Sequence, residues 1–254
     1  MSILSAIDVT KAFGGVTALS RCSVKMESGQ VIGLVGPNGA GKTTLFNILS
    51  GLIAPSSGAV EIQGRSIIGM RPDQIVALGA AKTFQVARGF GSLSVLENLL
   101  VADSSQRDLS VWRAFANFPG RLGTHRALVR QAIDVLAFLK LIDLKDMAAS
   151  HLSTGQKKLL DIGRALMLSP KIILLDEPLA GVNPKLAEQI AERIDDLRRS
   201  GMSVALVEHR VEFVRELCDY VYVLSEGKIL MEGRPNNVFS HTEVISTFLG
   251  GGAA

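Results

Sequence analysis

The sequence predicts an α/β fold built on a parallel β-sheet, and three observations indicate it. The apolar run Val31–Val35 is typical of a buried strand, and it leads through a glycine-rich turn into a helical segment that begins near residue 45. A second apolar run, residues 171–176, ends in the carboxylate Asp176 and is followed by a second carboxylate, Glu177. Open α/β sheets place their ligands at this end of the strands. From residue 154 onward, helical and strand-like segments alternate, which is typical of a parallel sheet with helices on its faces.

Residues 1–254 are long enough for a sizeable core and could form one large domain or one domain with a subdomain. The chain is 47% hydrophobic and 20% charged, which argues against extended disorder. Its net charge of +3 is small and no dense run of Lys and Arg occurs, so we expect no nucleic-acid partner. Cys22 and Cys218 match no disulfide framework or zinc spacing, and we expect two buried thiols. The sequence has neither a signal-peptide pattern at its start nor an apolar run of ~20 residues, so we expect a cytosolic chain unless a partner holds it at a membrane.

The first 80 residues are expected to be mainly strands. We expect strands at residues 2–10, 16–27, 31–35 and 59–64, with turns at 11–15 and 28–29. A helix should follow residue 44, and another should cover residues 72–78, where Pro72 suits the first helical position.

Residues 86–150 have a different character and are expected to form a mainly helical insert. Helical periodicity is found at residues 95–101 and 126–140. Between them, residues 103–124 contain many helix breakers and three aromatic residues, Trp112, Phe115 and Phe118. We interpret these aromatics as the cover of a satellite core, with an exposed partner patch as the alternative.

The last third resumes the α/β pattern. We expect helices at residues 154–168, 185–200, 211–217 and 242–249, and strands at 171–176, 203–208, 219–224 and 227–233.

Residues 36–44 have the composition and context of a phosphate-binding loop, and read Gly36, Pro37, Asn38, Gly39, Ala40, Gly41, Lys42, Thr43 and Thr44. Glycines let successive backbone N–H groups point inward at one anion, and the start of the following helix adds further unpaired N–H groups. We expect Lys42 to reach the β- and γ-phosphates, Thr43 to ligate Mg²⁺ and Thr44 to contact another phosphate. The alternative is a turn that only connects a strand to a helix. The loop therefore predicts the binding of a nucleoside triphosphate.

Asp176 and Glu177 follow a buried strand, at the edge of the sheet where the phosphate loop is expected. We expect Asp176 to belong to the Mg²⁺ shell opposite Thr43, and Glu177 to act as general base or to position water for hydrolysis. The alternative is an acidic turn that ends a strand.

Residues 152–156 begin a helix, and Ser153 with Gln156 forms the pattern of a capping box. Their position shortly before the Asp176 strand allows a second interpretation. Five segments stand in an order that resembles the ABC (ATP-binding cassette) ATPases, and the resemblance covers essentially the whole chain. They are the phosphate loop, Gln85 after a strand, residues 152–156, the Asp176–Glu177 strand, and His209 after another strand.

This resemblance implies a P-loop NTPase (RecA-like) core with an N-terminal antiparallel β-subdomain and a helical subdomain at about residues 86–150. It also implies roles for single residues. Phe13 would stack on adenine, Gln85 would touch the metal and the attacking water, and His209 would contact the γ-phosphate in the same subunit. Ser153, Thr154, Gly155 and Gln156 would form the signature that binds the nucleotide of the opposite subunit.

Further segments resemble one subgroup, the ATP-binding subunits of branched-chain amino acid importers and their relatives that carry urea or short amides. These segments are residues 11–16, 83–88, 181–184 and 248–250. The resemblance implies a Mg²⁺-dependent ATPase at the cytoplasmic face of the plasma membrane. Its partners would be transmembrane permease subunits, a second identical or homologous cassette and, indirectly, a solute-binding protein.

The chain departs from the family pattern at Thr154, which replaces a glycine, at Phe13, which lacks the hydroxyl of the commoner tyrosine, and at Arg210, where aspartate is frequent. No catalytic group is lost, so we still expect ATPase activity. The alternatives are the ATPase of an exporter, a soluble ABC protein acting on DNA or ribosomes, and a P-loop kinase. The kinase alternative leaves residues 152–156 and His209 unexplained.

Overall fold

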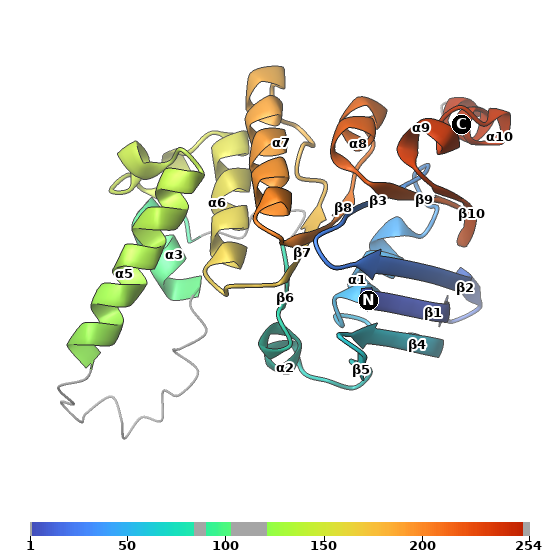
Figure 1. Cartoon of the computed structure of the whole chain (residues 1–254), viewed down its shortest axis with the longest axis horizontal. Coiled ribbons are helices and arrows are strands. Elements are labelled where there is room, and N and C mark those ends of the chain that lie inside the picture. Colours follow the sequence, from blue (N-terminus) through green and yellow to red (C-terminus); the bar gives the residue numbers. More distant parts are fainter. Residues whose placement is uncertain (1, 84–89, 103–120, 251–254) are drawn as a thin grey trace.

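The computed structural model describes residues 2–83, 90–102 and 121–250, which form two β-sheets flanked by helices (Figure 1). A six-stranded sheet has the order β10-β9-β3-β8-β7-β6, and a four-stranded antiparallel sheet has the order β2-β1-β4-β5. The larger sheet consists of β3 (Val31–Val35), β6 (Ala80–Lys82), β7 (Ile172–Asp176), β8 (Ser203–Val207), β9 (Tyr220–Ser225) and β10 (Lys228–Gly233). Its strands are parallel except for β10, which pairs antiparallel with β9 at one edge. The predicted parallel sheet is therefore confirmed.

The central strands bury both of their faces, and alternate residues belong to two separate cores. Val31, Ile173 and Val204 pack in the core that contains α6 (Thr154–Leu166), α7 (Pro184–Arg199) and α8 (Val211–Leu217). Their neighbours Ile32, Ile172 and Ala205 pack in the core shared with α1 (Lys42–Leu49) and the antiparallel sheet. This alternation follows from the period of two residues in a strand, and explains why the central strands read as unbroken apolar runs.

The smaller sheet lies beside α1 and consists of β1 (Ser2–Phe13), β2 (Val16–Glu27), β4 (Ser57–Ile62) and β5 (Arg65–Ser66) (Figure 1). The predicted bounds of β2 and β3 agree with the structure, whereas the predicted turn at residues 11–15 was too long. Residues 11–13 pair with β2 through Lys11↔Leu19, Ala12↔Thr17 and Phe13↔Val16, which leaves only Gly14 and Gly15 in the turn. Strand β4 begins two residues earlier than expected and ends at Ile62.

Most helices agree closely with the expected segments, but the helix Arg121–Phe138 begins five residues before its predicted start at residue 126, within the segment that is rich in helix breakers. The structure has α2 (Pro72–Ala77), α3 (Val95–Ala102), α5 (Arg121–Phe138) and α10 (Thr242–Gly250), with α6, α7 and α8 near their predicted bounds. It adds a short helix α9 (Pro235–Val238) and the 3₁₀ turns η2 (Ile142–Leu144) and η3 (Ala149–His151), which the sequence analysis did not anticipate. Helices α3 and α5 pack against α6 (Figure 1).

Two further expectations concern single residues and segments. Cys22 and Cys218 are free and buried, as predicted. Trp112, Phe115 and Phe118 lie outside the described residues. None of the helices in the described part of the chain is both long and apolar enough to span a bilayer.

Candidate active site

The phosphate loop connects β3 to α1 at the carboxyl end of the parallel strands. Its glycines adopt conformations that other residues rarely take, with φ of 147° at Gly36 and 100° at Gly41. A Cβ atom at Gly36 would lie 2.1 Å from the carbonyl oxygen of Leu224, and one at Gly41 would lie 2.8 Å from that of Ala18. Glycine is therefore required at both positions, because neighbouring backbone leaves no room for a side chain.

The loop is also fastened to the antiparallel sheet through Gly227, in the turn between β9 and β10. The Gly227 amide donates to the Ala40 carbonyl over 3.1 Å. In return, the Gly227 carbonyl accepts from the Ser20 amide (2.8 Å) and from the Cys22 thiol (3.1 Å). These bonds join the loop to β2 and to the end of the large sheet.

Lys42 folds back over the loop that precedes it. Its Nζ donates to the carbonyl oxygens of Gly36 (2.7 Å) and Pro37 (2.8 Å), and the residue is buried. Burial lowers the pKa of Lys42, while the nearby Glu177 carboxylate opposes this shift. The ammonium group is thus held at the mouth of the loop, where an anion would meet it.

A cavity of about 330 Å³ lies over the loop. The residues that line it are Ala18, Asn38, Gly39, Ala40, Gly41, Lys42, Thr43, Thr44, Glu177 and His209. The structure therefore brings the phosphate loop together with two of the predicted catalytic residues. It does so although Glu177 and His209 follow different strands, β7 and β8.

Glu177 is fixed by its backbone and by its side chain. Its amide donates to the Val207 carbonyl (3.1 Å), and its carbonyl accepts from the Lys158 ammonium group. Its φ of 48° lies in the left-handed region, which costs a non-glycine residue roughly 1–2 kcal/mol. The His209 Nε2 atom lies 3.1 Å from the Glu177 Oε1 atom, so a protonated Nε2 donates to the carboxylate. The Glu177 side chain is thus held beside the cavity over the phosphate loop.

Glu208 accepts hydrogen bonds from the backbone beside this pair, a role that the sequence analysis did not assign. It is buried, and its two carboxylate oxygens accept from the Leu179 amide (2.7 Å) and the His209 amide (3.1 Å). Burial raises the pKa of Glu208, against the lowering effect of these backbone donors. A charged residue after the apolar strand β8 was the signal available in the sequence.

Asp176, the predicted metal ligand, is buried and does not line the cavity. Its Oδ2 atom lies 3.3 Å from the Lys82 Nζ atom. An Asp carboxylate and the exposed Thr43 hydroxyl are hard oxygen donors, which suits Mg²⁺, an ion that takes few protein ligands and completes its shell with phosphate and water. The described residues contain no group of three or more His, Cys, Asp and Glu side chains that could hold a metal without a nucleotide. The remaining predicted ligand, Gln85, lies outside the described residues.

The signature residues are not part of this cavity. Ser153 caps α6 as a capping box, with the Gln156 amide 3.3 Å from its Oγ atom and its own amide 2.9 Å from the Gln156 Oε1 atom. Ser153 and Thr154 are exposed, whereas Gly155 is buried. A Cβ atom at Gly155 would lie 2.1 Å from the Leu186 Cδ2 atom, so this glycine is needed for packing within the chain.

Phe13 also stays outside the cavity, at the end of the β1–β2 hairpin. It is 49% exposed, and the Lys11 Nζ atom lies 5.0 Å from the centre of its ring. An open aromatic face of this kind is available for stacking.

Helix α7 begins with a side-chain cap and a proline. The Asn183 Oδ1 atom accepts from the Leu186 amide over 3.0 Å, and Pro184 is the first residue of α7.

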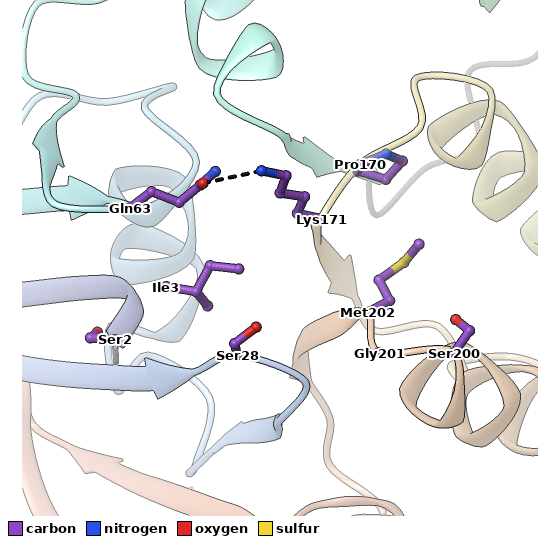
Figure 2. Close-up of a pocket in the computed structure, with 9 residues that line it drawn as sticks. All are labelled: Ser2, Ile3, Ser28, Gln63, Pro170, Lys171, Ser200, Gly201 and Met202. Carbon is purple, nitrogen blue, oxygen red and sulfur yellow. Dashed lines mark hydrogen bonds between the residues drawn. The ribbon is translucent and has the colours of Figure 1, made fainter.

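A larger cavity of about 680 Å³ lies beside the amino ends of β3, β7 and β8 (Figure 2). It is lined by Ser2, Ile3, Ser28, Gln63, Pro170, Lys171, Ser200, Gly201 and Met202. The interaction drawn among these residues is a hydrogen bond of 3.3 Å from the Lys171 Nζ atom to the Gln63 Oε1 atom (Figure 2). None of the lining residues is acidic and none belongs to the phosphate loop. We therefore assign the chemistry to the smaller cavity, because it combines an anion site with a carboxylate.

Comparisons with known proteins identify the family of the chain. The family model described as ABC transporter matches residues 19–180. The probable branched-chain amino acid transport ATP-binding protein LivG of Archaeoglobus fulgidus is 38% identical over 251 residues, which cover 98% of this chain and 96% of the relative. The high-affinity branched-chain amino acid transport ATP-binding protein BraF of Pseudomonas aeruginosa is 34% identical over 249 residues, 98% of each chain.

Solved structures show the same fold over the whole length. A nucleotide-free ATP-binding cassette from an ABC transporter matches with a TM-score of 0.86 at 35% identity, covering 98% of this chain and 99% of that one. The ADP conformation of MJ1267, an ATP-binding cassette of an ABC transporter, matches with a TM-score of 0.85 at 34% identity, with the same coverage. Family, relatives and fold lead to one conclusion: the chain belongs to the ABC transporter family, in which it is an ATP-binding cassette that hydrolyses ATP.

Proposed function

We propose that this cassette powers the import of branched-chain amino acids or of related small amides. The names of the relatives LivG and BraF contain branched-chain amino acid transport, and each relative aligns with 98% of this chain. The similarity therefore extends over almost the whole chain and is not limited to one segment. The alternative is another ABC system, an exporter or a soluble protein. The catalytic residues are common to all of these, because the transported solute never enters the nucleotide site.

The observation that carries the proposed hydrolytic mechanism is the pairing of Glu177 with His209 over the phosphate loop. Lys42 and the inward amides of the loop would bind the β- and γ-phosphates. Glu177 would accept a proton from the attacking water, and His209 would keep its carboxylate oriented and contact the γ-phosphate. Asp176 and Thr43 would hold Mg²⁺, which neutralises phosphate charge when it is bound. Gln85 is proposed to touch the same metal and water.

We propose that two cassettes act together, either two copies of this chain or this chain and a homologue. Ser153 and Thr154 are exposed at the start of α6 and do not line the cavity that contains Lys42. Amides at a helix start bind anions, so these residues suit the γ-phosphate held by a second subunit. Phe13, exposed at the end of the β1–β2 hairpin, would stack on the adenine ring in its own subunit.

The membrane partner is proposed to bind the helical subdomain of about residues 86–150. We propose that residues 103–124 and the adjacent α3 and α5 form this contact. A cavity of about 290 Å³ lies beside this part of the chain, lined by Gly91, Ala149, Ser150, Lys157, Leu160, Asp161 and Arg164. Such a site would place the cassette at the cytoplasmic face of the plasma membrane, held there by permease subunits.

Reconstitution tests the proposed substrate. The cassette is purified with the permeases encoded beside it and placed in vesicles with the solute-binding protein. ATP-dependent uptake of labelled leucine, urea and acetamide is then compared, with Glu177→Gln as the inactive control. Uptake of leucine or of an amide supports the proposal, whereas ATP-dependent export of these solutes, or transport of neither class, refutes it.

Crosslinking tests the docking surface separately. A photo-crosslinker at exposed Ser150 should capture the permease, and one at exposed Thr242, on α10, serves as the matched control. Crosslinks from Thr242 alone would place the docking surface elsewhere.

A further inference from the structure

Lys82 occupies a buried position between α1 and the end of β7. It is the last residue of the edge strand β6, where it pairs in register with Leu174 of β7. Its Nζ atom lies 3.3 Å from the Asp176 Oδ2 atom and donates to the Asn47 Oδ1 atom of α1. The same atom lies 5.2 Å from the centre of the Phe46 ring. The side chains of Lys82 and Asp176 are only 8% and 5% exposed, so water does little to screen this pair.

The position of Asn47 relates this ion pair to the expected metal ligands. Asn47 is four residues after Thr43 on α1, and residues with this spacing lie on one face of a helix. Lys82 therefore bridges α1 and β7, the two elements that carry Thr43 and Asp176. A divalent cation held by these two residues would lie between the same elements.

Thr83, the residue directly after β6, holds the backbone of the same aspartate. The Thr83 hydroxyl accepts from the Asp176 amide over 3.3 Å and donates to the Leu174 carbonyl over 3.4 Å. Consecutive residues thus fix both the main chain and the carboxylate of Asp176.

A buried carboxylate needs a compensating charge. Removing one partner of a buried ion pair strongly destabilises a protein, because the remaining charge is left desolvated. Among the described residues, Lys82 is the cation within ion-pair distance of Asp176. The folded chain therefore depends on Lys82 for as long as no metal is bound.

We propose that Lys82 is a positioning residue that serves as the built-in counter-cation of Asp176. It holds the carboxylate in place before a nucleotide arrives, and shares its charge with the metal afterwards. The inference rests on the proposed role of Asp176 in binding Mg²⁺. Its consequence is that a chain without the lysine charge needs the divalent cation more, since no other cation among the described residues lies within ion-pair distance of Asp176.

The first test compares thermal unfolding of the metal-free protein. Lys82→Met keeps most of the side-chain volume and removes the charge, and we expect it to lower the melting temperature. The double variant Lys82→Met with Asp176→Asn removes both charges and should melt at a higher temperature than the single variant. Lys82→Arg keeps the charge and should remain near the wild type, and Lys171→Met controls for the loss of an exposed lysine far from the site.

The second test measures the affinity for a fluorescent ATP analogue with EDTA and with Mg²⁺. The ratio of the two dissociation constants should rise at least about tenfold in Lys82→Met, equivalent to about 1.4 kcal/mol. Lys82→Arg should restore the wild-type ratio. In the Asp176→Asn background, Lys82→Met should leave the ratio unchanged.

The outcomes separate this inference from the proposal on which it rests. The inference is overturned if Lys82→Met is as stable as the wild type, if the double variant is no more stable than Lys82→Met, or if the affinity ratio stays constant although the wild type responds to Mg²⁺. If Mg²⁺ does not change the ATP affinity of the wild type or of Asp176→Asn, the proposed binding of Mg²⁺ by Asp176 is refuted instead. The unfolding comparison still decides whether Lys82 and Asp176 act as a pair.

Discussion

Replacing Gly155 with alanine should destabilise the junction between α6 and α7. The added Cβ atom would lie 2.1 Å from the Leu186 Cδ2 atom, 2.7 Å from its Cγ atom and 3.0 Å from the Val182 Cγ1 atom. Carbon atoms in favourable contact are about 3.5–4.0 Å apart, so the closest pair overlaps by roughly 1.5 Å. The Leu186 methyl group can rotate away, but the short distance to Cγ requires a new χ1 rotamer, and Val182 restricts that movement.

The expected cost is that of overpacking, about 1–3 kcal/mol. For a chain of this length, a loss of about 2 kcal/mol corresponds to a fall of roughly 4–8 °C in Tm. Thermal unfolding measures the loss directly. Gly15→Ala is the matched control, because Gly15 has no neighbour within 4 Å of the added atom and no positive φ.

A double-variant cycle identifies the cause. Leu186→Ala removes the side chain that the new methyl group meets, so Gly155→Ala with Leu186→Ala should lose less stability than the sum of the two single losses. An unchanged Tm in Gly155→Ala, or strictly additive losses, would refute the packing argument. If stability recovers in the double variant and ATP turnover does not, Gly155 is also needed for the phosphate of the second subunit.

Four further predictions concern the nucleotide site and its support. Glu177→Gln should retain ATP binding, nearly abolish phosphate release and trap an ATP-dependent dimer visible by light scattering; turnover near the wild-type rate would exclude Glu177 from the mechanism. Lys42→Ala should weaken the affinity for fluorescent ATP by at least about tenfold, since hydrogen bonds to charged groups contribute about 1.5–3 kcal/mol; unchanged affinity and turnover would contradict the proposed use of the loop. In the assembled transporter, Thr154→Gly should keep or raise turnover and Thr154→Val should lower it, whereas equal activity of valine and threonine would mean that the hydroxyl does not contact phosphate. Burial raises the pKa of Glu208 above 4.5, so its contribution to the stability of the fold is fully present below pH 4.5 and is lost as the pH rises through the raised pKa. A plot of unfolding free energy against pH should lack this decline in Glu208→Gln. Parallel plots for the variant and the wild type would contradict the argument.

Local patterns in the sequence were sufficient for the elements whose residues carry their own signals. The strands Val16–Glu27 and Val31–Val35 were predicted with their observed bounds, because turn residues flank them and apolar residues fill them. The end of β1 was missed, since Lys11 and Ala12 join the strand only through pairing with β2. The strand β5 was missed for a similar reason, because its two residues are held by β4.

In the candidate site, too, some residues could be predicted from local sequence patterns and others could not. The phosphate loop, Glu177 and His209 were predicted because each follows an apolar strand, and the fold brings those strand ends to one cavity. Lys82 was not predicted, since a lysine at the end of a short strand is typical of a surface, and its partner Asp176 is distant in the sequence. The tight packing of Gly155 against Leu186 was likewise invisible, because it depends on how α6 meets α7.

The hydrogen bonds that join the phosphate loop to Gly227 should affect the free energy of nucleotide binding. A loop whose shape is held in advance loses little conformational entropy when the nucleotide arrives, so less of the binding energy is spent on ordering it. The linkage also operates in the opposite direction, and a nucleotide at about 100 times its Kd should stabilise the folded cassette by about 2.7 kcal/mol. Since the Ser20 amide donates to Gly227, part of that stabilisation should extend into β2 and slow hydrogen exchange there, although no atom of the Ser20 side chain lines the cavity.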